Sequence, residues 1–310
     1  MKVGTVSLQQ GQEVIPLLRE GIAVKYAWIE GHSDHYAVFR LCRVLGVSRT
    51  GYLQWLRRPA SPRQRRNEEL GAQLRVIHAE NGGAYGRPRL WKALLARGER
   101  VGHERVRQLM AVHGLRSPYK RACRKTTQSA HEKPVAANLL DRQFGRQRPD
   151  RIWTADISYI ATAEGWLYLA AVLDLGSRRV VGWSMSGRMP AKLVCDALAM
   201  AYFRRRPAPG LIAHSDRGVQ YASDAYRRDL AKYGMHQSMS RKGNVWDNAP
   251  MESFFKTLKV ERVHEQRYAT RDEARSDIVN WIEGFYNRRR MHSALDYRSP
   301  VQYEEAARAA

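Results

Sequence analysis

Residues 151–160 read RIWTADISYI, and this stretch decides the fold. Apolar residues alternate with polar ones along it, which is typical of a β-strand with one buried face. Two more strand patterns follow closely, the nearly continuous apolar run WLYLAAVL at 166–173 and RVVGWSM at 179–185. Three short strands at this spacing indicate an antiparallel meander.

Further along the chain, the pattern alternates between helices and short strands. Helical periodicity occurs at 191–203, 223–233, 251–260 and 272–286, and short strand patterns occur at 211–213 and 236–239. An antiparallel meander followed by this alternation is an α/β order, compatible with one mixed five-stranded sheet with flanking helices.

The charge of the chain indicates a polyanionic partner. Its 310 residues hold 53 Lys and Arg against 30 Asp and Glu, a net charge of +23, of which +16 falls in residues 1–150. A chain with 44% hydrophobic residues and 8 Trp is not a disordered basic tail. The excess charge argues against a small-molecule enzyme acting alone and favours nucleic acid as the partner.

Other classes are excluded by what the sequence lacks. Its three cysteines, Cys42, Cys123 and Cys195, are far apart and form no CxxC pair, which argues against a disulfide framework or a cysteine zinc site. No run of 18 apolar residues occurs and no signal-peptide pattern begins the chain. We expect a cytoplasmic protein and no membrane partner.

A helix-turn-helix is predicted within residues 25–60. Residues 37–58 read AVFRLCRVLGVSRTGYLQWLRR, in which Gly46 ends one apolar-periodic helix and Ser48 is placed to cap the next. The apolar face of the second helix would hold Tyr52, Leu53, Trp55 and Leu56. Its exposed side would present Arg49, Thr50 and Gln54 to a major groove. A plain helical hairpin is the alternative.

A second helical DNA-binding domain is predicted at 61–118. Apolar stripes, with Pro88 in a first helical turn and glycines at 98 and 114, indicate three helices. Arg105 would face outward toward DNA, although a scaffolding helical bundle explains the same pattern. Residues 1–24 form an N-terminal extension, and the proline-punctuated basic stretch 119–149 is read either as a DNA-contacting linker or as an ordinary solvated loop.

Three acids stand out in the C-terminal part, residues 150–305. Asp156 lies within the first strand, Asp216 follows the fourth strand, and Glu252 opens a helix. Each acid alone could be a cap, a turn or a salt bridge. An Asp inside a buried strand is costly unless it is paired or metal-bound, and converging carboxylates can hold two Mg²⁺ ions.

The stretches WTADISYI (153–160), HSDRGVQY (214–221) and DNAPMESFFKTLK (247–259) resemble the catalytic core of bacterial insertion-sequence transposases. The likeness is to the second-frame (OrfB) protein of insertion-sequence family three, and it runs from about residue 25 to residue 303. YGRPRLWKALLARG at 85–98 and YNRRRMHSALDYRSP at 286–300 also match. The resemblance implies a ribonuclease-H-like, integrase-type core preceded by an all-α helix-turn-helix region.

The resemblance also implies the catalytic residues. Asp156, Asp216 and Glu252 match the family's Asp, Asp, Glu (DDE) triad, with 35 residues between the last two. They would bind two Mg²⁺ ions, or Mn²⁺, for cleavage of the element's 3′ end and strand transfer. Lys259 lies two helical turns after Glu252 and would contact a DNA phosphate, unless it is an ordinary solvated lysine.

For several other residues the sequence allows two roles. Arg290 and His292 would contact the DNA backbone or form a surface-exposed basic turn. His214 would orient a water molecule or pack within its strand. Asp247, five residues before Glu252, is not a triad member, and a metal or water role for it stays open.

Three functions compete. The first is a DNA transposase acting on terminal repeats and target DNA, as a homo-oligomer and with an upstream-frame subunit as a possible partner. The second is a DNA-binding accessory or regulatory subunit with an inactive core. The third is a plain ribonuclease-H-type nuclease, which would not need a helical half of net charge +16. All three acids are present, which favours the transposase.

Overall fold

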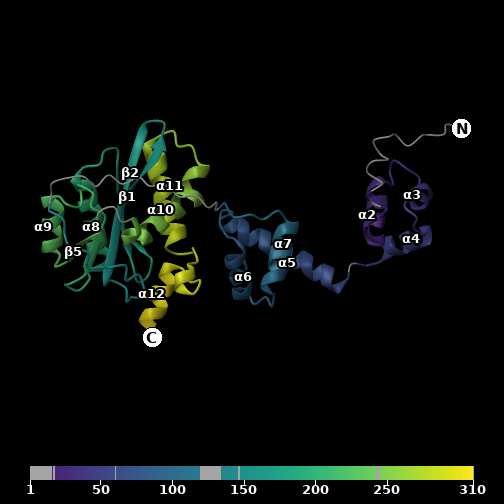
Figure 1. Ribbon diagram of the computed structural model, residues 1–310, viewed down its shortest axis with the longest axis horizontal. Coiled ribbons are helices and arrows are strands. Elements are labelled where there is room, and N and C mark those ends of the chain that lie inside the picture. The colour runs from purple at the N-terminus through teal and green to yellow at the C-terminus, as the bar shows by residue number, and fades with distance from the viewer. Residues whose placement is uncertain are drawn as a thin grey trace. The chain divides into compact units, whose positions relative to one another are not determined.

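The computed structural model describes residues 16, 18–59, 61–118, 134–145, 147–241 and 245–309. The chain divides into two compact units, one up to Glu69 and one from Leu70 onward. Figure 1 shows the helices and strands of both, and each unit is described by itself. No helix within these described residues is long and apolar enough to cross a membrane.

The N-terminal unit holds α2 (Ile22–His32), α3 (Val38–Val44) and α4 (Arg49–Arg57). As predicted, Ser48 caps α4, because its side chain accepts a hydrogen bond from the backbone N–H of Gly51 at 3.3 Å. Ile29, Leu45 and Tyr52 are at the centre of the small core of this unit.

The expected apolar face of α4 is wrong in part. Tyr52 is buried, but Leu53 and Leu56 are 39% and 42% exposed. The reason is the short contact surface between these helices, which leaves room for one narrow stripe of side chains from α4. Arg49, Thr50 and Gln54 lie at the surface of the same helix, where a partner could reach them.

The second unit begins with three helices. The last part of α5 (Pro62–Glu80) packs with α6 (Arg87–Ala96) and α7 (His103–Val112). Their shared core contains the apolar stripes read from the sequence: Leu70, Leu74, Ile77, Leu90, Leu94, Val106 and Leu109. Gly98 and Gly114 follow α6 and α7 with φ of +86° and +64°, the left-handed conformation that ends a helix without strain. Arg105 is half-buried at the base of α7.

The predicted mixed sheet is confirmed. β1 (Ile152–Thr162), β2 (Gly165–Asp174) and β3 (Val180–Ser186) form the antiparallel meander. β4 (Ile212–Ser215) and β5 (His236–Met239) add to β1 in parallel, which gives the strand order β3-β2-β1-β4-β5. β1 is therefore the central strand.

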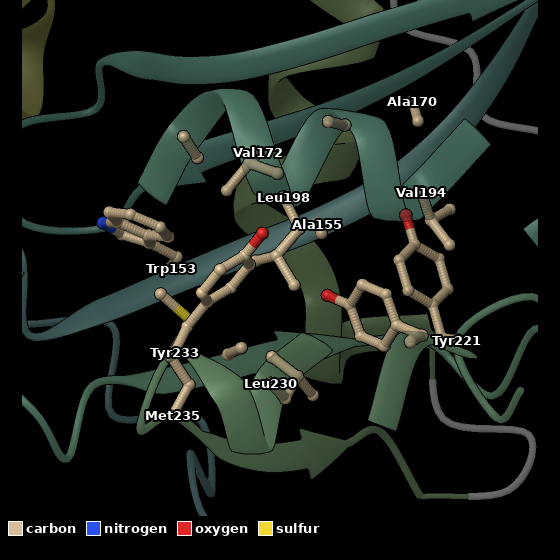
Figure 2. Packing of buried hydrophobic residues seen from close by; sticks show 14 of the residues in the cluster. Trp153, Ala155, Ala170, Val172, Val194, Leu198, Tyr221, Leu230, Tyr233 and Met235 are labelled. Carbon is tan, nitrogen blue, oxygen red and sulfur yellow. The ribbon is translucent and has the colours of Figure 1, made fainter. Parts of the chain in front are cut away.

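Helices cover both faces of the sheet. On one face, α8 (Ala191–Arg205) and α9 (Asp224–Lys232) pack over Trp153, Ala155 and Val172 from the strands. Figure 2 shows this packing, with Leu198 and Leu230 supplied by the two helices.

α10 (Ala249–Glu261) and α11 (Arg271–Asn280) pack on the opposite face of the sheet, over side chains such as Leu169 and Ala171. A π-helix, η3 (Trp281–Tyr286), extends α11 to the predicted end. Short 3₁₀ turns η1 (Val245–Asn248), η2 (Val263–Glu265) and η4 (Ser293–Leu295) connect the C-terminal helices, and α12 (Pro300–Ala309) follows the last of them.

Part of the stretch expected as linker packs against the core. Leu140 is buried in a cluster with Ile152 and Leu175. The backbone N–H of Leu139 also donates to the Ser238 hydroxyl at 2.9 Å. Residues 134–145 thus belong to the compact core, because Leu140 buries apolar surface that a solvated linker would expose and the backbone of Leu139 is hydrogen-bonded to β5. Residues 119–133 lie outside the described part of the chain.

A buried carboxyl at the end of β2 makes stability depend on pH. Asp174 accepts hydrogen bonds from the backbone N–H groups of Asp150 and Ser177, both at 2.6 Å, yet burial raises its pKa to about 6. This pKa lies above the ordinary value of 3.8, so the protonated Asp174 carboxyl stabilises the folded state. This contribution is fully present below pH ~4 and is lost as the pH rises through 6. We expect about 3 kcal/mol of unfolding free energy to be lost over that interval. Urea unfolding of the wild type and of Asp174→Asn across this pH range measures the effect. The unfolding free energy of the variant should not show this fall with rising pH.

Candidate active site

Asp156 lies on the central strand, on the face that α10 covers. Its neighbour Ala155 packs in the core of the opposite face, and strand side chains alternate between faces. Its carboxylate accepts a hydrogen bond from the backbone N–H of Ile157 at 2.7 Å. Burial raises the pKa of Asp156 well above its ordinary value, and the nearby carboxylates of Asp216 and Glu252 add to that rise.

The topology of the sheet brings Asp216 to the same place. β4 runs parallel to β1, with Ser215 paired to Ala155, so the next residues along the two strands are Asp216 and Asp156. The Asp216 carboxylate accepts from the backbone N–H of Gly218 at 2.9 Å, which orients it within the turn after β4. The two aspartates are thus neighbours across a parallel pair of strands, although 59 residues separate them in the chain.

Glu252 approaches from the helix. The side chain of Asn248 donates to the backbone carbonyl of Ala155 at 3.1 Å, which ties the start of α10 to β1 immediately before Asp156. Glu252 is in the first turn of that helix, where the N-terminal end of the macrodipole favours a carboxylate. Burial nevertheless raises its pKa. Asn248 was missed in the sequence, although an Asn directly before Ala-Pro at a helix start is a recognisable signal.

Lys259 lies on the same side of α10. Its Nζ is 4.6 Å from the centre of the Tyr159 ring on β1. Burial lowers its pKa, and the negative charge of Asp156 opposes that effect. The half-buried ammonium therefore lies next to the acids, not in open solvent as an ordinary surface lysine would.

The acids fit a hard divalent cation by their chemistry. Carboxylate oxygens are the ligands that Mg²⁺ prefers, and the charges of Asp216 and Glu252 add to the effect of burial in raising the pKa of Asp156, so a positive charge would be stabilised beside it. Among the residues that the structure describes, no three His, Cys, Asp or Glu side chains are close enough together to form a ready-made metal site.

Asp247 has a structural role. Its buried carboxylate forms ion pairs with Arg241 and Arg142, both at 2.9 Å, and accepts from Asn138 at 3.0 Å. The hydrogen bonds from Arg241 hold the pKa of Asp247 well below its usual range. It thereby joins the 134–145 segment to the turn that precedes α10, so a metal or water role is not needed to explain its charge.

Arg290 does not have the role expected from the sequence. It is 3% exposed and forms a two-pronged ion pair with Glu261, with distances of 2.6 and 2.7 Å. A guanidinium with this burial is unavailable to a DNA backbone, so its proposed DNA contact is wrong. Arg290 belongs to the segment 286–300, which packs against the end of α10. This tertiary packing, which no local sequence pattern shows, removed Arg290 from the surface. His292 is half-buried, with its ring edge-on to Tyr286 at 4.9 Å.

His214 packs within its strand, the more ordinary of its two predicted roles. Its ring is buried on β4 and hydrogen-bonded to the hydroxyls of Ser238 at 2.8 Å and Ser240 at 3.3 Å. Burial lowers its pKa to about 4, so the ring is neutral at physiological pH. It supports the strand that carries Asp216.

Family models match most of the second unit. Two models, each described as "Integrase core domain", match residues 146–245 and 252–307, and an "HTH-like domain" matches residues 64–122. The catalytic core domain of BIV integrase has 14% identity, covering 52% of this chain and 97% of its own, with a TM-score of 0.39.

Two relatives are similar over almost their whole length. An uncharacterized 31 kDa protein of insertion element IS600 from Shigella sonnei is 45% identical, covering 86% of this chain and 97% of its own. The transposase InsF for insertion sequence IS3A from Escherichia coli is 41% identical, covering 91% of this chain and 98% of its own. The chain therefore belongs to the family of insertion-sequence transposases that includes InsF of IS3.

Proposed function

We propose that this protein is a DNA transposase that cuts the ends of its element and joins them to target DNA by metal-dependent phosphoryl transfer. The observation that carries the proposal is the placement of Asp156 and Asp216 side by side on paired β1 and β4, with Glu252 in the first turn of α10, whose start is tied to β1. Burial raises the pKa of Asp156 and of Glu252, and the nearby carboxylates raise that of Asp156 further, which supports a cation site here. This placement favours the enzyme over an accessory protein with an inert core.

Each residue has a defined task in this reaction. Asp156, Asp216 and Glu252 would hold Mg²⁺, or Mn²⁺, as a pair of ions. When bound, such ions activate the attacking oxygen and stabilise the departing one, so the reaction requires no serine or cysteine nucleophile. Lys259, next to Asp156, would bind a phosphate oxygen of the DNA end and hold the scissile bond beside the carboxylates.

The helical parts would bind the terminal repeats. Arg49, Thr50 and Gln54 are exposed on α4, the second helix of the predicted helix-turn-helix, and Arg105 lies on α7. A net charge of +23 supplies the phosphate attraction. The active species would be a homo-oligomer on DNA, with or without an upstream-frame subunit, acting at the nucleoid in the bacterial cytoplasm.

A cleavage and strand-transfer assay tests the function. The substrate is the DNA flanking the gene, with Mg²⁺ present or removed by chelation. We expect 3′-end nicking and joined products with the metal and neither without it. Nicking that is independent of the element's end sequence would support a general nuclease instead.

Substituting Gln54 with Ala should separate base reading from phosphate binding. Loss of one base contact should weaken binding to the terminal repeat by about 1–3 kcal/mol and leave binding to unrelated DNA unchanged. Fluorescence anisotropy at several salt concentrations measures both, and the salt slope should not change, because no phosphate contact is removed. Equal weakening on both DNAs would place α4 against the backbone, not in the groove.

A further inference from the structure

A cavity lies on the side of α10 that faces away from Glu252. Its volume is about 570 Å³, within the range of roughly 300–1,000 Å³ usual for small-ligand sites. α10 lines it with Pro250, Ser253 and Thr257, which share one side of the helix. Glu252 and Lys259 do not line it, so this cavity is separate from the candidate active site.

The charged groups that line the cavity are arginines. Arg89, Arg178 and Arg290 contribute to the lining together with His292, and no Asp or Glu is among the described residues that form it. The buried Glu261 carboxylate balances the charge of Arg290, so Arg89 and Arg178 supply the positive charge of the cavity. The cavity therefore has an electrostatic preference for an anion.

Arg178 is the cation whose position in the cavity wall is best defined. It stands in the turn between β2 and β3 with a φ of +58°, a conformation that a non-glycine residue rarely adopts. Its guanidinium donates to the carbonyl of Phe144 at 3.3 Å, which ties it to the cavity wall. Burial lowers the pKa of Arg178. Burial also lowers the pKa of His292, and the charges of Arg290, Arg89 and Arg178 lower it further.

The remaining wall includes one accessible aromatic side chain. Phe144 is half-buried and lines the cavity beside the cationic groups, whereas Phe254 and Tyr286, at 2% and 3% exposed, offer almost no surface to a ligand. An aromatic face beside guanidinium groups is a combination that binds a nucleotide, with the base stacked and the phosphate on arginine.

We propose that this cavity binds a single phosphate-bearing nucleotide, with the phosphate on Arg178 and the base against Phe144. The nucleotide is either free in solution or one unstacked nucleotide of a DNA strand. The site uses none of the three acids, so its failure would leave the proposed catalytic function standing, and the reverse also holds.

Calorimetric titration of the full-length chain with dAMP, in buffer without divalent metal, tests the proposal. Deoxyadenosine, which lacks the phosphate, serves as the negative probe, and a short labelled single-stranded oligonucleotide is the second probe. Arg178→Gly removes the guanidinium and keeps the left-handed backbone. Arg206→Gly is the matched control, since Arg206 is also an arginine with positive φ (+47°) and lies at the exposed end of α8.

We expect Arg178→Gly to weaken binding by about tenfold to a hundredfold relative to the control. Weakening with both probes identifies a site that accepts a free nucleotide, and weakening with the oligonucleotide alone identifies a strand nucleotide. Ser253→Asp, which adds a carboxylate from α10, should weaken binding at least as much and decides the matter if Arg178→Gly unfolds. Equal binding of deoxyadenosine and dAMP, or variants that match the control with both probes, would overturn the proposal.

Discussion

Asp156→Asn, Asp216→Asn and Glu252→Gln should each reduce magnesium-dependent cleavage of element-end DNA by about a thousandfold or more. Each substitution removes one carboxylate charge at almost constant shape. A catalytic metal contributes several kcal/mol to the transition state, and about 4 kcal/mol corresponds to a thousandfold in rate. Single-turnover cleavage of a labelled end fragment measures the loss.

The same three variants should bind the terminal repeat as tightly as the wild type. Their substitutions lie in the core, whereas the predicted base-reading residues lie on α4 in the other unit. Asp272→Asn is a matched control, because its side chain is 86% exposed and forms a surface pair with Arg275. Near wild-type cleavage by any triad variant would remove that residue from the proposed metal site.

Replacing Glu261 with Ala should cost about 3–5 kcal/mol of unfolding free energy. The Glu261 side chain is fully buried and that of Arg290 is 4% exposed, so the substitution leaves a guanidinium without its carboxylate in a dry interior. Urea unfolding followed by circular dichroism measures the change in midpoint. The loss should be visible in the unfolding of the full chain, because the pair joins the last residue of α10 to Arg290 inside the core.

Asp196→Ala is the control for that experiment. The Lys192–Asp196 pair has side chains that are 75% and 46% exposed, and such pairs contribute less than about 1 kcal/mol. Replacing both members of the buried pair, as Glu261→Leu with Arg290→Met, should restore much of the loss, since no charge then stays buried. Equal effects of Glu261→Ala and Asp196→Ala would show that the buried pair is not needed for stability.

The strands were readable from the sequence because their signals are local, and the same stretches hold the acids of the proposed triad. The pattern RIWTADISYI predicted β1, and the polar Asp156 within it indicated a functional acid. The order of elements predicted the mixed sheet, whose topology places the end of β4 beside Ala155 of β1, one residue before Asp156. Once that order is known, Asp216 has to lie close to Asp156.

The failures have a common physical origin. Arg290, in a run of three arginines, looks like a surface base, and only its burial against Glu261 changes that reading. Residues 134–145 look like a linker, and only the packing of Leu140 assigns them to the core. In both cases the deciding partner is more than ten residues away in the sequence, outside any local window.

By itself, the sequence determined the element order, the preference for a polyanion and the three acids, because hydrophobic periodicity, net charge and residue type are properties of the chain. Only the tertiary structure decided which charges remain available. It buried Arg290 and Asp247 in ion pairs and placed Lys259 beside Asp156. It also brought Arg178 and His292 together in the wall of the cavity next to α10. Solvent exposure and the distance to an opposite charge depend on how remote segments pack, and these two quantities determine whether a charged side chain stabilises the fold or binds a ligand.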